Sequence, residues 1–207
     1  MWVNPAYSTE DDDGWAIVRA NPLATIVTGT PLRATHMPLI RDDDGALVGH
    51  VPLADPISEQ LTAGSEVLAI FRGPASYISP SWYVDVGLPT YNFTVVHVRG
   101  TTEKLDETQL RAHMNDLMSY HERTQKHGQT PPWSAQGAAL DRLEMLLPKI
   151  AGFRINDATI ESKRKLGQNR SQADARTVVT HLRRSRDQDD HRIADLMDEV
   201  WRLGDRA

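Results

Sequence analysis

Short apolar runs, each bounded by turn residues, predict that most of the first half of this chain is built from β-strands. These runs are rich in β-branched and aromatic residues, which suit a pleated, half-buried surface. We expect strands over residues 23–28, 32–40, 47–51, 67–72, 91–99, 149–156 and 158–163. The fourth and fifth of these flank a long joining segment, residues 73–90, in which three Pro-containing dipeptides restrict the backbone. This central stretch is where we expect the chemistry.

Helical periodicity and capping residues predict helices at both ends of the chain and between the strands. In the helix expected after Asp106, the residues Leu110, Met114, Leu117 and His121 fall on one stripe. Before the central strands, one helix is expected to begin near Gly14, and a short one follows Asp55 and stops at Gly64. After them, one helix is expected from Ser134 to about Leu147, and another begins at Ser171. The last begins at Asp189 or Asp190 and ends at Gly204. This arrangement predicts an α+β fold with peripheral helices around a small closed β-barrel. We expect one domain over residues 1–207, with C-terminal helices over residues 171–204.

Composition and charge limit the functions and the kinds of site that this protein can have. The chain has 207 residues, of which 40% are apolar and 25% charged, and its net charge is −5. It therefore lacks the overall positive charge that attracts nucleic acid or anionic membranes. The absence of cysteine excludes disulfides, thiolate metal sites and a cysteine nucleophile. No apolar run approaches the length of a membrane span, and no targeting segment is evident at the N-terminus, so a cytoplasmic protein is expected.

Two groups of residues resemble metal sites but have simpler explanations. The acidic run at residues 42–45 lacks the alternating oxygen ligands of a calcium loop, and it is better suited to a hairpin turn. The histidines His113, His121 and His127 lack the i, i+4 spacing with a carboxylate that zinc sites on helices use. We therefore expect no metal there, and we expect these histidines to be solvated or to lie at a helix end.

The joining segment and the start of the strand that follows it carry polar groups beside flat apolar rings. These residues are Tyr77, Ser79, Ser81, Trp82, Tyr83, Tyr91 and Asn92. A planar heteroaromatic ligand with a polar edge requires a wall of this kind. The alternative interpretation is an aromatic loop that caps one end of the barrel.

A second candidate site is the segment over residues 165–171, which supplies an anion-binding combination. It contains two cations, Lys165 and Arg170, two amides, and the free N–H groups of a helix that begins at Ser171. The alternative is a basic loop that pairs with surface carboxylates. Thr35 and His36 supply a hydroxyl and a ring on an earlier strand, and they either face a ligand or form a strand residue pair whose polar groups are satisfied inside the barrel. His97 lies among valines, which favours a core or interface position over a ligand role.

Several motifs in register resemble one family. The segments GPASYISPSWY (73–83) and PTYNFTVVHVRG (89–100) are its central signature, and PLA (22–24), ATHMPL (34–39), GH (49–50) and KLGQNRS (165–171) follow its order. The chain thus resembles the PaiB-like proteins, known as FMN-binding negative transcriptional regulators. The resemblance implies an FMN-binding split barrel and a homodimer with FMN between the subunits. It also implies cofactor contacts from Thr35, His36, Ser79, Trp82, Tyr91, Asn92, Lys165 and Arg170.

Three departures from the family pattern bear on the cofactor. The family often has Trp at the position of Tyr91, Ser at that of Gly167, and an Arg-Ala pair after the Gly-His motif, where this chain reads Val51-Pro52-Leu53-Ala54. The missing arginine removes one contact to a phosphate or an acidic substrate.

The resemblance leaves three functions open. The first is a flavin-dependent oxidoreductase or regulator. The second is a haem-dependent enzyme similar to the piperazate synthases of the same family, which close an N–N bond in N-hydroxyornithine; haem b would then be held by His36, His50 or His97. The third is a regulator that binds DNA directly through the basic stretch over residues 163–186, although aspartates follow it immediately. No Gly-rich dinucleotide fingerprint is present.

Overall fold

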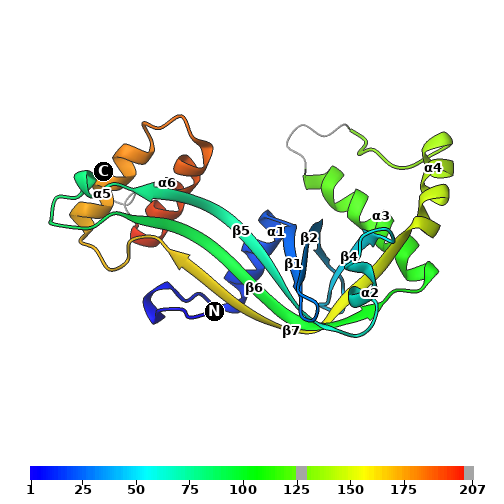
Figure 1. The fold of residues 1–207 in the computed structure, drawn as a ribbon. Helices are drawn as coiled ribbons and strands as arrows, with labels where there is room; N and C mark the ends of the chain where they lie inside the picture. The colour runs from blue at the N-terminus through cyan, green and yellow to red at the C-terminus, as the bar shows by residue number, and fades with distance from the viewer. Residues whose placement is uncertain (125–129, 203–207) are drawn as a thin grey trace. The chain divides into compact units, whose positions relative to one another are not determined.

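The computed structural model describes residues 1–124 and 130–202 of an α+β protein (Figure 1). Its seven strands form one sheet in the order β2-β1-β5-β6-β7-β4-β3. The helices of at least nine residues are α1 (Asp11–Ala20), α3 (Glu107–Thr124), α4 (Ala138–Leu146), α5 (Gln172–Leu182) and α6 (Gln188–Trp201). The strands are β1 (Leu23–Thr28), β2 (Arg33–Pro38), β3 (Ile40–Arg41), β4 (Leu47–Pro52), β5 (Glu66–Ile78), β6 (Thr90–Lys104) and β7 (Ile150–Lys165), with the one-turn helix α2 (Ser58–Leu61) between β4 and β5. Three 3-10 helices, η1 (Pro5–Tyr7), η2 (Pro80–Trp82) and η3 (Leu147–Lys149), complete the described elements.

The chain folds into two compact units. Unit 1 contains Met1–Asn21, Phe71–His97 and the chain from Ile160 onward. Unit 2 contains Pro22–Ile70 and Val98–Thr159. The long strands β5, β6 and β7 contribute to both units, and each unit is described separately below.

Unit 2 is held by antiparallel strand pairs whose alternate residues face a core. The β1–β2 hairpin pairs Ile26 with Thr35, and β4 pairs with β7 so that Gly49 lies opposite Phe153. Ile26, Leu47 and Phe153 have no exposed surface, because alternation along a strand sends every second side chain inward. The turn between β3 and β4 is the acidic run, where Gly45 has a φ of +91° and the Asp42 carboxylate accepts the Ala46 N–H at 2.8 Å. The hairpin turn predicted there is confirmed.

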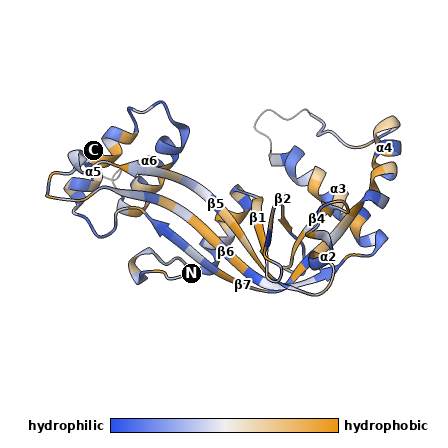
Figure 2. Ribbon diagram, viewed as in Figure 1, coloured by the Kyte–Doolittle hydropathy of each residue, from blue (hydrophilic) through white to orange (hydrophobic). Residues whose placement is uncertain are grey.

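Unit 1 places the helices α5 and α6 against the ends of the long strands. The buried apolar residues of α5 are Ala175, Val178, Val179 and Leu182, which follow the i, i+3, i+4, i+7 spacing of one helix face. They pack with Ile78 of β5, Leu166, and Ile193, Ala194 and Met197 of α6 in one apolar cluster. Figure 2 shows hydrophobic and hydrophilic residues interleaved along these helices. No helix in the described part of the chain is both long enough and apolar enough to cross a membrane.

The strands β5, β6 and β7 are longer than the sequence predicted. Residues 67–72 and 91–99 are only parts of β5 and β6, and the two strands expected over residues 149–163 are one strand, β7. Gly73 lies inside β5, where a Cβ atom would come within 2.0 Å of the Thr94 hydroxyl oxygen. Gly73, which we expected in the joining segment after the strand, therefore permits close approach of two neighbouring strands. In β7, Asp157 has a φ of +51° and the strand continues beyond it.

Four helix starts also differ from the prediction. Helix α1 begins at Asp11, three residues before the expected start. Helix α2 begins at Ser58, because the Asp55 side chain accepts the Ile57 N–H in a turn before the helix. Helix α4 begins at Ala138, since the Ser134 hydroxyl accepts a hydrogen bond from the Gln136 side chain and caps no helix.

Helix α6 starts after Asp187, whose side chain accepts the Asp189 N–H at 2.8 Å. The expected end at Gly204 lies outside the described residues. Strand β1 and the start of α5 at Ser171 are confirmed.

Candidate functional site

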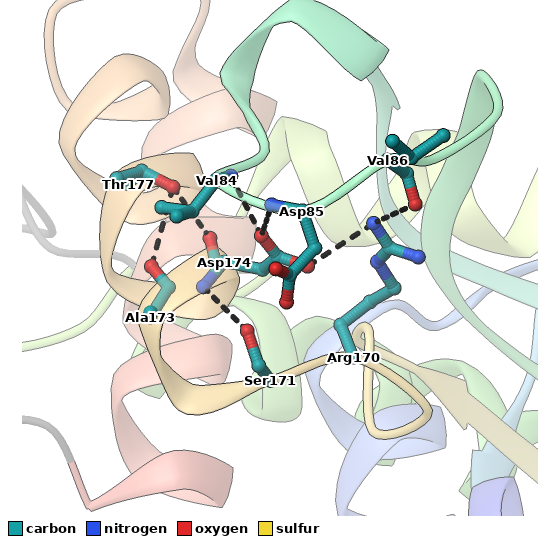
Figure 3. Close-up of polar contacts among 8 residues, drawn as sticks. All are labelled: Val84, Asp85, Val86, Arg170, Ser171, Ala173, Asp174 and Thr177. Carbon is teal, nitrogen blue, oxygen red and sulfur yellow. Dashed lines mark hydrogen bonds and ion pairs between the residues drawn. The ribbon is translucent and has the colours of Figure 1, made fainter.

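The loop over residues 79–89 is anchored to the start of α5 by a buried carboxylate (Figure 3). Asp174, which is 1% exposed, accepts the backbone N–H groups of Val84 at 2.7 Å and Asp85 at 3.0 Å. Ser171 caps the helix by accepting the Asp174 N–H at 3.1 Å. Burial by itself would raise the pKa of the Asp174 carboxyl, but the two N–H donors and the Arg170 guanidinium outweigh it, so this pKa lies below its usual value. The loop is therefore fixed by an ionised group.

Arg170 belongs to the same anchor. Its guanidinium lies 3.1 Å from the Asp174 carboxylate, donates to the Val86 carbonyl at 3.2 Å, and stacks 4.0 Å from the centre of the Tyr83 ring. Burial raises the pKa of the Tyr83 hydroxyl. The cation that we predicted to hold an anion is thus already engaged within unit 1.

The polar wall predicted from the loop is assembled in unit 1. Ser79 and Ser81 lie at the start of η2, and their hydroxyls are 2.7 Å apart. The Trp82 ring stacks on His181 of α5, with ring centres 5.2 Å apart and planes 7° from parallel. One face of Trp82 is therefore covered by the protein's own imidazole.

A second part of the site lies on the strands β5, β6 and β7 within unit 1, where Tyr77 and Tyr91 share one face of the sheet. Tyr77 and Tyr91 meet edge to face with ring centres 5.8 Å apart, and both are about half exposed. The Lys165 ammonium contacts the hydroxyl of Thr90, at the start of β6. Desolvation, with a contribution from the neighbouring Lys163, lowers the pKa of the Lys165 amine. Aromatic rings and a cation thus lie on the neighbouring strands of one sheet.

Asn92 is not part of this face. It follows Tyr91 directly, so its side chain points to the opposite side of β6, where its amide nitrogen lies 3.3 Å from the Met197 sulfur. The residue is 2% exposed, and its carbonyl oxygen has no hydrogen-bond partner among the described residues. Gly167 lies nearby with a φ of +79°, a conformation that favours glycine over the serine common in the family.

Thr35 and His36 lie in unit 2, on β2. The Thr35 hydroxyl donates to the Asp55 carboxylate at 3.0 Å, and His36 Nδ1 lies 3.0 Å from the Thr25 hydroxyl. Each therefore has a hydrogen-bond partner within unit 2. Their predicted contact with a cofactor stays a prediction.

A histidine pair in unit 2 was not anticipated. His113 on α3 is 4% exposed, so the expectation that it is solvated or at a helix end is wrong. Its Nε2 lies 3.2 Å from Nδ1 of His50 on β4. Desolvation, with a smaller effect of His50, lowers the pKa of His113 from 6.5 to about 4, and burial also lowers the pKa of His50. Both imidazoles are consequently neutral near pH 7.

The remaining histidines from the metal and haem hypotheses are in different places. His97 is half-buried on β6, and His121 lies near the end of α3 in an edge contact with Tyr120. His127 lies outside the described residues. Among the described residues, no three histidine, aspartate or glutamate side chains are grouped as a metal site requires.

Sequence reasoning missed the anchoring role of Asp174. The Ser-x-x-Asp spacing marks a helix start, which the prediction used, but in that motif the carboxylate usually serves its own helix. Here the carboxylate binds a loop 89 and 90 residues away in the chain. No local pattern signals such a partner.

Comparisons with known proteins find relatives of this chain. The family model described as "Putative FMN-binding domain" matches residues 1–158. The "Protease synthase and sporulation protein PAI 2" of Bacillus subtilis (strain 168) is 32% identical over 198 residues, which cover 92% of this chain and 93% of that protein.

Two solved structures share the fold at low sequence identity. The FAD and heme binding protein from Mycobacterium smegmatis has a TM-score of 0.59 and 16% identity, over 84% of this chain and 78% of its own. A conserved hypothetical protein from Mycobacterium tuberculosis has a TM-score of 0.57 and 15% identity, over 80% and 91% of the two chains. The predicted α+β split-barrel fold is confirmed.

Proposed function

The chain belongs to the PaiB-like family of proteins with an FMN-binding domain, and from this premise we propose that it is a flavoprotein that uses FMN in an oxidoreductase reaction. The observation that carries the proposal is the sheet of unit 1, where the Tyr77–Tyr91 pair spans β5 and β6, and β6 lies beside β7, which bears Lys165. An isoalloxazine ring requires flat apolar surfaces, and its phosphate requires a fixed cation.

The residues present fit FMN in part. Lys165 and Thr90 would hold the phosphate, and Tyr77 and Tyr91 would contact the ring system. Bound FMN would supply electron or hydride transfer, while the chain supplies binding and orientation. Arg170 fits less well as a phosphate ligand than the sequence suggested, because Asp174 already neutralises it.

The visible absorption spectrum tests this function. The protein is purified without added cofactor, desalted, and measured again after incubation with FMN and with haemin. We expect flavin bands that survive desalting in the wild type and are reduced in Lys165→Gln. The control Lys104→Gln, which removes an exposed lysine at the end of β6, should retain the flavin. Failure of the wild type to retain or bind FMN would contradict the proposal.

A haem-dependent activity is the second candidate. Its support is that His36 and His50 each use Nδ1 in a hydrogen bond, to Thr25 and His113 respectively. A histidine held in this way at Nδ1 can present Nε2 to iron. A Soret band after haemin, in place of flavin bands, would favour this activity and direct assays to N-hydroxylated amino acids such as N-hydroxyornithine.

Direct DNA binding has less support. Three arginines of the basic stretch form ion pairs within unit 1: Arg164 with Glu199 at 2.6 Å, Arg170 with Asp174, and Arg183 with Asp195 and Asp198. Charges neutralised in this way contribute little to phosphate binding. Any regulatory effect is then indirect, through the flavin reaction or a partner. Specific, salt-sensitive DNA binding by the pure protein would contradict this conclusion.

A homodimer is part of the proposal. The anchored loop exposes Val84, Val86 and Leu88, of which Val86 is 99% exposed. An ordered loop that presents three aliphatic side chains to solvent is typical of an interface. We expect light scattering after size exclusion to give the mass of two chains, and Val86→Asp with Leu88→Asp to reduce it to one. A wild-type mass of one chain would contradict the dimer.

A further inference from the structure

We propose that the cavity between α3 and the turn that joins β3 to β4 binds a primary alkylamine in its ammonium form, through the imidazole of His113 and the carboxylates of Asp116 and Asp43. The site lies wholly in unit 2. The inference goes beyond the proposed function, because it concerns a second ligand and uses no residue assigned to FMN.

The cavity has the size and the lining of a small-molecule site. Its volume is about 750 Å³, which is within the range of ligand pockets. His113, Asp116 and Tyr120 line it from α3, where a spacing of three or four residues places side chains on the same face of the helix. The buried side chains of Val48 and Leu105 add apolar surface. A ligand with an apolar chain and one polar end fits such a lining.

One polar atom of this lining is buried and has no partner. His113 is 4% exposed, and its Nε2 lies 3.2 Å from Nδ1 of His50. The two nitrogens of an imidazole point in divergent directions, so Nδ1 of His113 points away from His50, and no hydrogen-bond partner reaches it among the described residues. Buried polar groups normally have a partner. When the Nε2–H of the neutral ring donates to His50, Nδ1 is an acceptor that an ammonium N–H satisfies.

The charges of the lining favour a cation over an anion. Asp116 lies one turn after His113 on α3, and Asp43 lies in the β3–β4 turn. Neither carboxylate forms an ion pair with any side chain in the described part of the chain. Arg154 also lines the cavity, but its guanidinium already lies 3.2 Å and 3.7 Å from two other carboxylates of the turn. These carboxylates would repel an anionic ligand at Arg154.

The two other arginines of the lining do not change this balance. Arg41 directs its Nε–H back to the Gly45 carbonyl at 3.1 Å. Arg123 follows His113 on α3 at a distance of about 15 Å along the helix axis. With four aspartates and three arginines, the lining carries a net charge of −1. The part of the cavity next to His113 is therefore the part suited to positive charge.

An organic cation fits this lining better than a metal ion. No three histidine, aspartate or glutamate side chains within residues 1–124 and 130–202 are grouped as a metal site requires. An ammonium group needs only acceptors for its three N–H bonds, which a neutral imidazole and one or two carboxylates supply. Val48 and Leu105 can then cover the alkyl chain that follows the ammonium.

Hexylamine, hexanol and hexanoate test the inference, because they share an alkyl chain and differ in the charge at its end. Titration calorimetry near neutral pH measures their binding to the full chain. We expect hexylammonium to bind with a dissociation constant at or below about 1 mM, and the other two to bind at least about tenfold more weakly. Asp116→Asn should weaken hexylammonium about threefold, as expected for an exposed charge partner, and His113→Gln about tenfold. The control Asp141→Asn, at an exposed position of α4 outside the lining, should bind like the wild type.

Heteronuclear spectra of the histidine rings give a second readout that needs no variant. In the complex with hexylammonium, Nε2 of His113 should carry the proton and Nδ1 should be bare, because Nδ1 accepts from the ligand. A protonated Nδ1 in the complex would overturn the proposed arrangement. So would tighter binding of hexanoate, equal binding of hexylamine and hexanol, binding that Asp116→Asn and His113→Gln leave unchanged, or no wild-type binding of hexylammonium up to about 10 mM.

Discussion

The buried histidine pair predicts that the protein loses stability between neutral and mildly acidic pH. In the unfolded chain the His113 imidazole takes up a proton near pH 6.5, whereas in the folded protein it does so only near pH 4. Between these values the unfolded state binds more protons, so the free energy of unfolding falls as the pH falls. The stability that the neutral His113 contributes is complete above its unfolded pKa of 6.5, and it is lost as the pH falls toward the folded pKa of about 4. His50, whose pKa is also lowered, acts in the same direction.

The size of this effect follows from the two pKa values of His113. A pKa of about 4 in place of 6.5 corresponds to a total of about 3 kcal/mol. Between about pH 7.5 and about pH 5, linkage gives a loss of about 2 kcal/mol from this residue. Other groups also titrate in this range, so the comparison must be made between variants.

The variant His113→Gln isolates the histidine contribution, because a glutamine amide can still donate to His50 but takes up no proton. Its matched control is His121→Gln, the same change at a less buried position on the same helix. Urea unfolding followed by circular dichroism gives the free energy of unfolding at each pH. We expect the stability of the wild type to decline by about 2 kcal/mol more than that of His113→Gln over this range, and that of His121→Gln to follow the wild type. A wild type and His113→Gln with the same pH dependence would refute the argument.

Three further predictions concern the fold and the loop anchor. Asp174→Ala should lower the free energy of unfolding by about 3 kcal/mol, because it leaves Arg170 and two loop N–H groups without their partner. Asp174→Asn should cost less because an oxygen acceptor remains; urea titration measures both, and equal values for the two would contradict the role of this oxygen as acceptor of the loop N–H groups. Phe153→Ala should cost about 4 kcal/mol, since the ring has no exposed surface, whereas Leu32→Ala at an exposed position should change stability by less than about 0.5 kcal/mol in the same assay. Ser171→Ala should cost about 1 kcal/mol through loss of the cap of α5, while Ser134→Ala should have almost no effect because Ser134 caps no helix; a reversed order would show that the caps are wrongly assigned.

Local features of the sequence determined several elements of this protein. The run Leu23–Thr28 is a strand because its β-branched residues alternate inward, and the acidic run before Ala46 is a turn because Gly45 permits a left-handed backbone. Ser171 starts a helix because its hydroxyl can accept an N–H three residues on. The motifs in register also identified the family, from which the split barrel and FMN follow. Each of these depends on neighbours in the chain or on the order of short motifs.

Only the tertiary structure decided which side chains meet. Asp174 binds the backbone of Val84, 90 residues earlier, and His113 pairs with His50, 63 residues earlier. No local pattern indicates such partners, because register and packing bring them together only after the strands and helices have assembled. The same reason explains why Arg170, a free cation by its sequence, is neutralised in the fold. It also explains why Lys163 lies beside Phe93 and why Lys165 contacts Thr90: β6 and β7 are neighbours in the sheet.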